Sequence, residues 1–111
     1  MDGSSDYLAG LAAEMRAFTE ARDWGRFHAP KNLAMALAGE AGELVAEFQW
    51  LTAEGSERAA LTPEQVAAIE AELADVLIYL VQLADRLGTD LPAAVAAKMA
   101  LNARRFPTID G

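Results

Sequence analysis

The sequence predicts an all-α protein, and three observations lead to this fold class. Alanine and leucine dominate the 111 residues while β-branched residues are few, a composition that favours helix over strand. Apolar residues recur at helical spacing, as at Leu8, Leu11, Met15 and Phe18. Capping residues, glycines and prolines divide the chain into four such segments. We therefore expect one domain, residues 1–111, folded as a four-helix bundle that oligomerises through its helices.

Residues 6–22 are expected to form the first helix, because serines that can cap it precede its first turn. The sequence DWGRFHAPKN follows as a loop rich in aromatic and basic side chains, and a glycine and a proline interrupt it. The second helix is expected to run from Lys31 or Asn32 to Thr52. It contains two glycines, each of which costs a helix interior about 1 kcal/mol relative to alanine.

A polar linker leads to Thr62, which opens the sequence TPEQ, typical of a capping box with proline in the first turn. This third helix is expected to continue to Leu87 and to stop at Gly88. Apolar side chains surround much of its circumference, so we expect it also to pack against a second copy of the chain. Asp90 is expected to cap the fourth helix, which fades near residues 106–107.

Composition excludes several classes of function. The net charge of -8 argues against binding to nucleic-acid polymers, which depends on lysine and arginine neutralising phosphates. The absence of cysteine excludes disulfides and thiol chemistry, and a single histidine excludes histidine-rich metal sites. The longest apolar run, VLIYLV, is too short to span a bilayer, and no secretory signal is recognisable. We expect a cytoplasmic protein with no membrane partner.

Two acidic pairs stand out on the predicted helices. Glu40 and Glu43 are three residues apart on the second helix, and Glu72 and Asp75 are three apart on the third. Side chains at this spacing are neighbours, so each pair could converge on one cation. Oxygen-only ligands suit hard cations, Mg²⁺ above all. A solvated acidic helix face is the alternative, and spacing alone does not decide between the two.

A basic row lies on the fourth helix, where Lys98, Asn102 and Arg105 share one face. Lysine and arginine suit phosphate groups, so this row could bind a small phosphate ligand. The alternative is that the basic residues only complement the dipole of the helix C-terminus.

Four further residues, Trp24, His28, Trp50 and Tyr79, could contact a nucleobase by stacking or hydrogen bonding. Packing in the core is the alternative for each of them. Trp24 and His28 lie in the loop before the second helix, and loops are where functional residues concentrate.

Three stretches, GEAGELVAEFQW, EAELADVLIYLVQLAD and KMALNARRFP, together resemble the MazG-like all-α nucleoside triphosphate pyrophosphohydrolases. The loop RDWGRFHAPKNL is most similar to the dCTP pyrophosphatase branch of that family. The resemblance covers residues 11–107 and implies a single MazG-like nucleotide pyrophosphohydrolase domain that forms dimers or tetramers. The implied reaction is Mg²⁺-dependent hydrolysis of a nucleoside triphosphate, dCTP or a modified dCTP, to the monophosphate and pyrophosphate, which would cleanse the nucleotide pool.

The resemblance also implies a role for each candidate residue. Mg²⁺ would be held by Glu40, Glu43, Glu72 and Asp75, the phosphates by Lys98, Asn102 and Arg105, and the base by Trp24, His28, Trp50 and Tyr79. Glu43 and Glu47 are alternative general bases, although Glu47 stands where the branch is expected to have an apolar residue. The alternative to an enzyme is a non-catalytic helical module that senses nucleotides or binds another protein.

Overall fold

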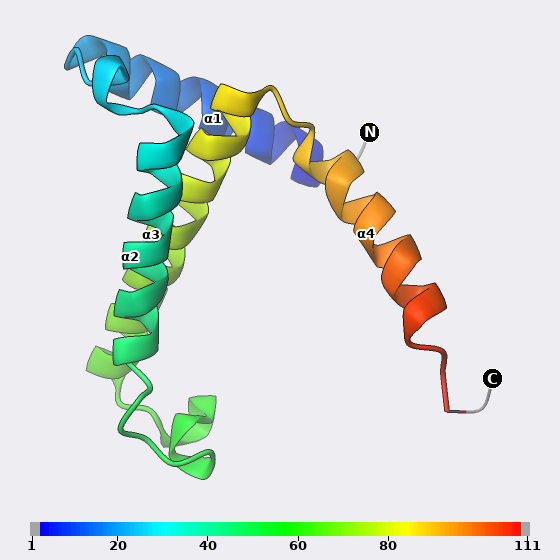
Figure 1. Cartoon of the computed structure of the whole chain (residues 1–111). Coiled ribbons are helices and arrows are strands. Elements are labelled where there is room, and N and C mark those ends of the chain that lie inside the picture. The colour runs from blue at the N-terminus through cyan, green and yellow to red at the C-terminus, as the bar shows by residue number, and fades with distance from the viewer. Residues whose placement is uncertain (1–2, 110–111) are drawn as a thin grey trace.

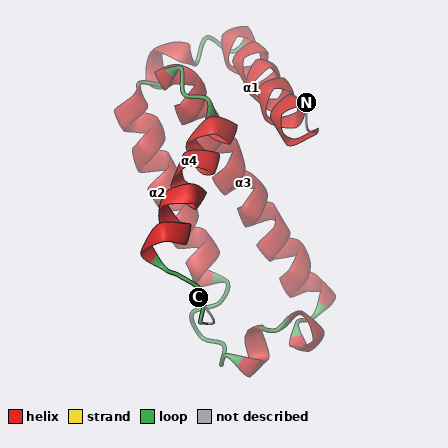
Figure 2. Ribbon diagram, turned by 90° about the vertical axis from the view of Figure 1, so that its right-hand side faces the viewer, coloured by secondary structure: helices red, strands yellow, loops and turns green. Residues whose placement is uncertain are grey.

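A computed structural model describes residues 3–109, and within that range the chain contains helices and loops but no strand (Figure 2). The predictions of an all-α class and of four α-helices are confirmed. None of the described helices is long and apolar enough to cross a membrane. The helices are α1 (Gly3–Ala21), α2 (Pro30–Ala46), α3 (Pro63–Leu87) and α4 (Leu91–Arg105), with short 3-10 turns η1 (Gly25–Phe27), η2 (Glu54–Ser56) and η3 (Arg58–Ala60).

Helices α2 and α3 form an antiparallel pair, and the loop that joins them carries η2 and η3 (Figure 1). Helix α1 crosses α3 near the other end of this pair. Helix α4 leaves the end of α3 and projects away from the other helices (Figure 1). The chain therefore consists of a helical hairpin, a helix packed across one end of it and a fourth helix standing apart.

The ends of α3 and the start of α4 follow the predicted capping residues. The Thr62 hydroxyl accepts a hydrogen bond from the Gln65 amide at 3.1 Å, and the Gln65 side chain accepts one from the Thr62 amide at 2.8 Å. Gly88 ends α3 in the left-handed conformation with φ 68°. The Asp90 carboxylate accepts a hydrogen bond from the Ala93 amide at 3.0 Å. These boundaries are confirmed because each cap acts within one helical turn.

The predicted end of the second helix at Thr52 is wrong, because α2 ends at Ala46. Beyond this point the amides of Glu47 and Phe48 bond to carbonyls three residues back, which is the tighter 3-10 pattern. The chain then turns toward η2. Trp50 consequently lies outside the helix, and it is 88% exposed.

The core of a single chain is small. Leu33 of α2 is 1% exposed, the buried apolar residues of α3 are Ile69, Val81 and Ala84, and none of residues 91–105 of α4 is buried. The radius of gyration is 17.1 Å, against about 13 Å expected for a globular domain of this length. The four helices therefore do not close into the predicted bundle within one chain.

Apolar side chains remain exposed on the two helices where a closed bundle would bury them. Leu73, Leu80 and Leu87 recur at seven-residue intervals on one face of α3 and are 51%, 37% and 59% exposed. On α4, Val95 and Met99 are 58% and 62% exposed. These faces have no partner among the described residues of the chain.

Candidate functional site

Helix α2 directs Glu40 toward α3 because of where this residue falls in the helical period. Leu33 is buried, and Leu37 and Leu44 are half-buried on the same side of the helix. Residues 33, 37, 40 and 44 follow the spacing of one helix face. Glu40 therefore lies on the apolar stripe that packs against the neighbouring helix, and it is itself half-buried.

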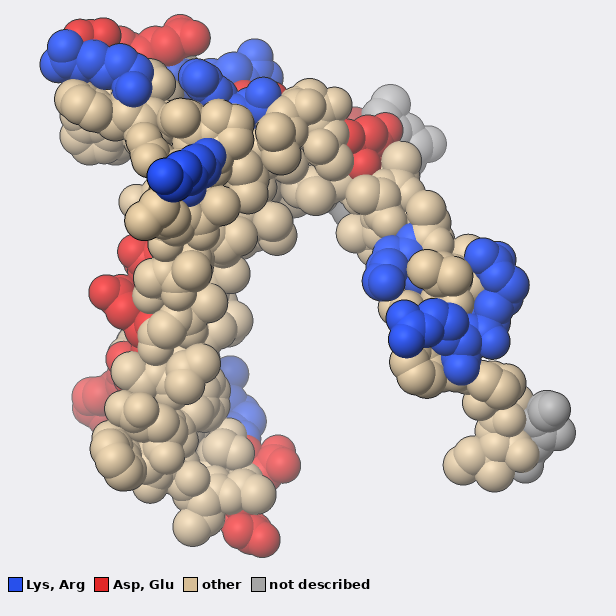
Figure 3. Space-filling view, in the orientation of Figure 1, with Lys and Arg blue, Asp and Glu red and all other residues tan. Residues whose placement is uncertain are grey.

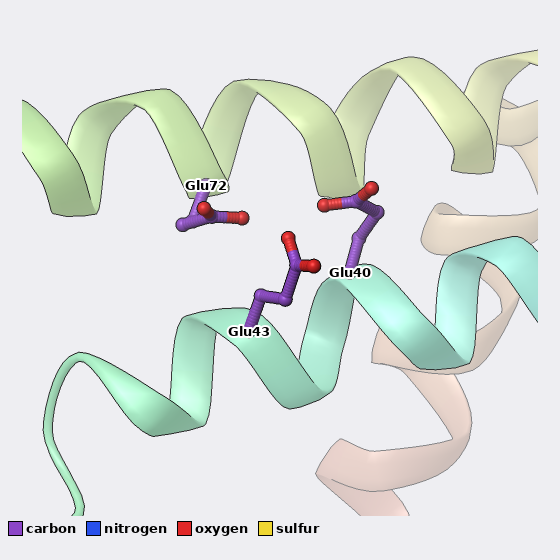
Figure 4. A group of neighbouring side chains, drawn as sticks. All are labelled: Glu40, Glu43 and Glu72. Carbon is purple, nitrogen blue, oxygen red and sulfur yellow. The ribbon is translucent and has the colours of Figure 1, made fainter.

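Three carboxylates meet between the paired helices. Glu40 and Glu43 extend from α2 toward α3, and Glu72 extends from α3 toward α2 (Figure 4). One oxygen from each carboxylate lies within 4.8 Å of the other two. Oxygen atoms Oε2 of Glu40 and Oε2 of Glu72 are buried and have no hydrogen-bond partner among residues 3–109. We call these three residues the acidic cluster.

The acidic cluster is electrostatically unfavourable as it stands. Burial raises the pKa of Glu40 to about 7, and the nearby carboxylates of Glu43, Asp75 and Glu72 reinforce the effect. The pKa of Glu72 is also raised, chiefly by burial and then by the charges of Glu43 and Asp75. Each effect disfavours the ionised form of the side chain. A cation placed among these oxygens would reverse this penalty.

The donor atoms fit a divalent cation. Buried polar atoms in proteins nearly always have a hydrogen-bond or ionic partner, so two unpaired carboxylate oxygens indicate that a positively charged partner binds here. No basic side chain is that partner, because the two ion pairs found in the described part of the chain are Arg16–Asp85 and Arg26–Asp23. The cluster is therefore a possible acidic metal site, and its oxygen-only donors suit a hard cation.

Asp75 and Glu47 lie outside the acidic cluster. Asp75, the fourth predicted ligand, is half-buried one turn beyond Glu72, and its charge acts on both Glu40 and Glu72. Glu47 caps the C-terminus of α2 one turn beyond Glu43 and is also half-buried. The structure thus gathers three of the four predicted ligands and leaves Asp75 and Glu47 at the border.

The predicted base-contacting residues are not brought together within one chain. Trp24 and His28 precede α2, whereas Trp50 follows it. A helix of 17 residues rises about 25 Å, which separates these aromatic groups along the hairpin. Tyr79 is half-buried on α3, one turn beyond Asp75. His28 lines a cavity of about 150 Å³ together with Leu33 and Gln82.

The predicted phosphate-contacting row also stands apart. Lys98, Asn102 and Arg105 lie on α4, where Asn102 is half-buried and the other two are exposed. Figure 3 shows lysine and arginine side chains gathered on α4, across an open space from the α2–α3 pair. One chain therefore carries the acidic cluster and the basic row on separate arms.

The packing around Trp24 does not follow from the apolar spacing of the first helix. Phe18 belongs to that apolar stripe, yet its ring packs edge-on against Trp24 with centroids 5.7 Å apart. Asp23, not Gly25, takes the left-handed backbone conformation, with φ 55°. The available signal was the sequence at the end of α1, where a short polar residue follows the last helical turn.

Comparison with known proteins gives a consistent result. The model of the MazG-like family matches residues 36–111. Human dCTP pyrophosphatase 1 is 51% identical over 90 residues, which cover 81% of this chain and 53% of the human protein. The mouse protein of the same name is 50% identical over the same shares. The chain thus spans about half the length of the curated relatives it matches.

The fold has a close structural counterpart. A crystal structure of a pyrophosphatase from Archaeoglobus fulgidus superposes with a TM-score of 0.83 and is 36% identical in sequence. The match covers 92% of this chain and 94% of the archaeal one. An open arrangement of helices is thus shared with a solved protein over nearly the whole length of both chains.

Proposed function

Because the chain belongs to the MazG-like family, we propose that it hydrolyses a nucleoside triphosphate to the monophosphate and pyrophosphate. The preferred substrate would be dCTP or a 5-modified dCTP, a choice supported by the 51% identity to human dCTP pyrophosphatase 1. Residues 1–111 would act as one MazG-like domain, working on the cytoplasmic nucleotide pool. The observation that carries the proposal is the acidic cluster with its two buried, unpaired oxygens.

The metal in this proposal is Mg²⁺. Glu40, Glu43 and Glu72 would hold it, with Asp75 at the border of the site. When bound, Mg²⁺ would supply charge neutralisation for the triphosphate and a lower pKa for a bound water. The all-oxygen donor set favours this ion over those that prefer nitrogen or sulfur ligands.

A carboxylate of the chain would accept the proton of the attacking water. Water attacks the α-phosphorus, the bond from that phosphorus to the bridging oxygen breaks, and pyrophosphate leaves with the electron pair. Glu43 or Glu47 would accept the proton from the attacking water. Glu43 is exposed within the acidic cluster, whereas Glu47 lies one turn away and outside it. Glu47 would thus keep its lone pairs available while the cluster is occupied.

A complete site would need a second copy of the chain. Lys98, Asn102 and Arg105 would contact the phosphates, and in this arrangement α4 of one chain would lie beside the acidic cluster of another. Two observations support such a homo-oligomer, a dimer or tetramer. The basic side chains gathered on α4 (Figure 3) and the carboxylates of the acidic cluster carry opposite charges. The exposed apolar faces of α3 and α4 are of the kind that subunit contacts bury.

The base would lie among Trp24, His28, Trp50 and Tyr79. Stacking on an aromatic side chain is worth about 1–3 kcal/mol per base and tolerates any base. Discrimination among bases therefore needs directed hydrogen bonds, for which His28 is the candidate side chain. If two copies of the chain packed with their hairpins in opposite directions, Trp50 of one copy would lie near the loop of the other copy that carries Trp24 and His28.

The test is turnover by the purified chain with Mg²⁺ and a panel of canonical and 5-modified nucleoside triphosphates. We expect pyrophosphate and monophosphate, with dCTP or its 5-methyl form preferred, and activity that is lost in excess chelator. Glu40→Gln should lower kcat/KM about 100-fold or more. Glu70→Gln, which removes one exposed carboxylate of α3 outside the cluster, is the matched control and should retain activity.

Three results would contradict the proposal. Orthophosphate and diphosphate as products would exclude attack at the α-phosphorus. Nucleotide binding without turnover would favour a sensor instead of an enzyme. A monomer by light scattering, if it were fully active, would exclude a site that needs a second copy.

A further inference from the structure

The C-terminus of α1 closes in a hydrogen-bonded cap of the Schellman type. The amide of Asp23 donates to the carbonyl of Glu20 at 3.1 Å, and the amide of Trp24 donates to the carbonyl of Thr19 at 2.9 Å. This pattern requires the first of the two donor residues to be left-handed, and Asp23 meets this requirement with φ 55°. Trp24 is therefore folded back toward the helix that precedes it.

Two side chains of α1 then hold the Trp24 ring. Phe18 meets it edge-on at 67° with ring centroids 5.7 Å apart. The Arg22 guanidinium lies 3.6 Å from the Phe18 centroid and 5.9 Å from the Trp24 centroid. Its Nη1 atom also donates a hydrogen bond to the Phe18 carbonyl at 3.0 Å. Arg22 thus fixes Phe18, and Phe18 supports Trp24.

This arrangement lies at the surface and not in the core. Phe18 is 41% exposed and Trp24 is 44% exposed, so the tryptophan keeps part of its ring free. A left-handed aspartate is an uncommon conformation, and such conformations are enriched at functional sites. The geometry is that of a supported aromatic surface ready to receive another flat group.

We infer that Phe18 and Arg22 are positioning residues that hold Trp24 in the orientation in which its free face stacks on the nucleobase. The inference rests on the proposed function, since it takes Trp24 as a contact of the base. Neither Phe18 nor Arg22 touches the substrate. Their contribution is to remove rotational freedom from Trp24 before binding, and such preorganisation strengthens binding more than it speeds the chemical step.

The kinetic test compares KM and kcat for dCTP in four single variants of the full chain. Phe18→Ala and Arg22→Met should each raise KM roughly two- to tenfold, the range of an aromatic pair, with kcat little changed. Phe18→Tyr keeps the aromatic ring and should therefore have the same KM as the wild type. Arg58→Met is the control for loss of an arginine, because Arg58 is exposed in η3, in the loop between α2 and α3 and away from the Phe18–Trp24 pair, and it should leave KM unchanged.

A spectroscopic readout separates positioning from a general loss of structure. The chain has two tryptophans, so a Trp50→Phe background leaves the emission of Trp24 alone. In that background Phe18→Ala should shift the emission to the red and lower its anisotropy, while far-ultraviolet circular dichroism stays the same. Unchanged Trp24 emission in Phe18→Ala and in Arg22→Met would overturn the inference.

Trp24→Ala distinguishes a failure of this inference from a failure of the proposed function. If Trp24→Ala raises KM while Phe18→Ala and Arg22→Met do not, Trp24 contacts the base without their help and the inference is wrong. If Trp24→Ala leaves KM unchanged, the assignment of Trp24 to the base site falls, and the inference falls with it. If Phe18→Ala and Arg22→Met instead make the oligomer dissociate, and the remaining oligomer keeps the KM of the wild type, the surface around Trp24 is a subunit contact and the inference is overturned.

Discussion

Replacing Gly42 with alanine should stabilise the protein and impair its activity at the same time. Gly42 lies inside α2, next to Glu43 of the acidic cluster, and Gly39 lies beside Glu40. A Cβ atom built at either glycine meets no heavy atom within 4 Å in the described chain. The folded chain alone gives no steric reason for glycine at these two positions, so we expect the space to serve the ligand.

The magnitude follows from helix propensity. Glycine costs a helix interior about 1 kcal/mol relative to alanine, so each substitution should raise the free energy of unfolding by about that amount. For 111 residues the entropy of unfolding near 60 °C is about 0.23 kcal/mol/K, so Tm should rise by about 4 °C per substitution.

The assay measures thermal unfolding of metal-free, nucleotide-free protein at one fixed concentration, together with kcat/KM. Gly10→Ala is the matched control, because Gly10 lies inside α1 with the same empty surroundings and far along the chain from the cluster. It should raise Tm without changing kcat/KM, whereas Gly42→Ala should raise Tm and lower kcat/KM. A fall in Tm for Gly42→Ala would refute the claim that the folded chain has room for a Cβ atom at this position. A higher Tm with full activity would refute the claim that the ligand needs this space.

Three further predictions concern stability. In metal-free protein, the pKa of Glu40 is raised from 4.5 to about 7, so this side chain loses its proton at lower pH in the unfolded state, and the free energy of unfolding should fall as pH rises between these values. In urea titrations, the stability advantage of Glu40→Gln over the wild type should therefore grow across that window. An advantage that shrinks with rising pH would contradict the raised pKa. Gly88→Ala should lower the free energy of unfolding by about 1 kcal/mol, because alanine must adopt φ 68°; no loss in denaturant titration would mean that the cap relaxes. Leu33→Ala should cost about 2–5 kcal/mol, since Leu33 is 1% exposed between α2 and α3, and a loss below 1 kcal/mol would show that the hairpin core is not where the structure puts it.

Where spacing along one helix is sufficient, the sequence alone predicts which candidate side chains lie close together. Glu40 and Glu43 are neighbours on any helix, because side chains three residues apart share a face. That Glu72 of α3 faces them depends on how the two helices pack, as does the peripheral position of Asp75. The pairing of Phe18 with Trp24 likewise depends on the backbone turn at Asp23.

The sequence by itself determined the helical class and most helix ends, because these are local properties. Thr62 with Gln65, Gly88 and Asp90 each act through hydrogen bonds or backbone conformation within about one turn, so their effect can be read from neighbouring residues. The early end of α2 at Ala46 carries no such cap, and only the folded chain revealed it. Tertiary structure also decided that α4 stands apart and carries its basic row away from the acidic cluster. The reason is that burial of an apolar stripe can be satisfied by the same chain or by another copy, and the pattern of residues is the same in both cases.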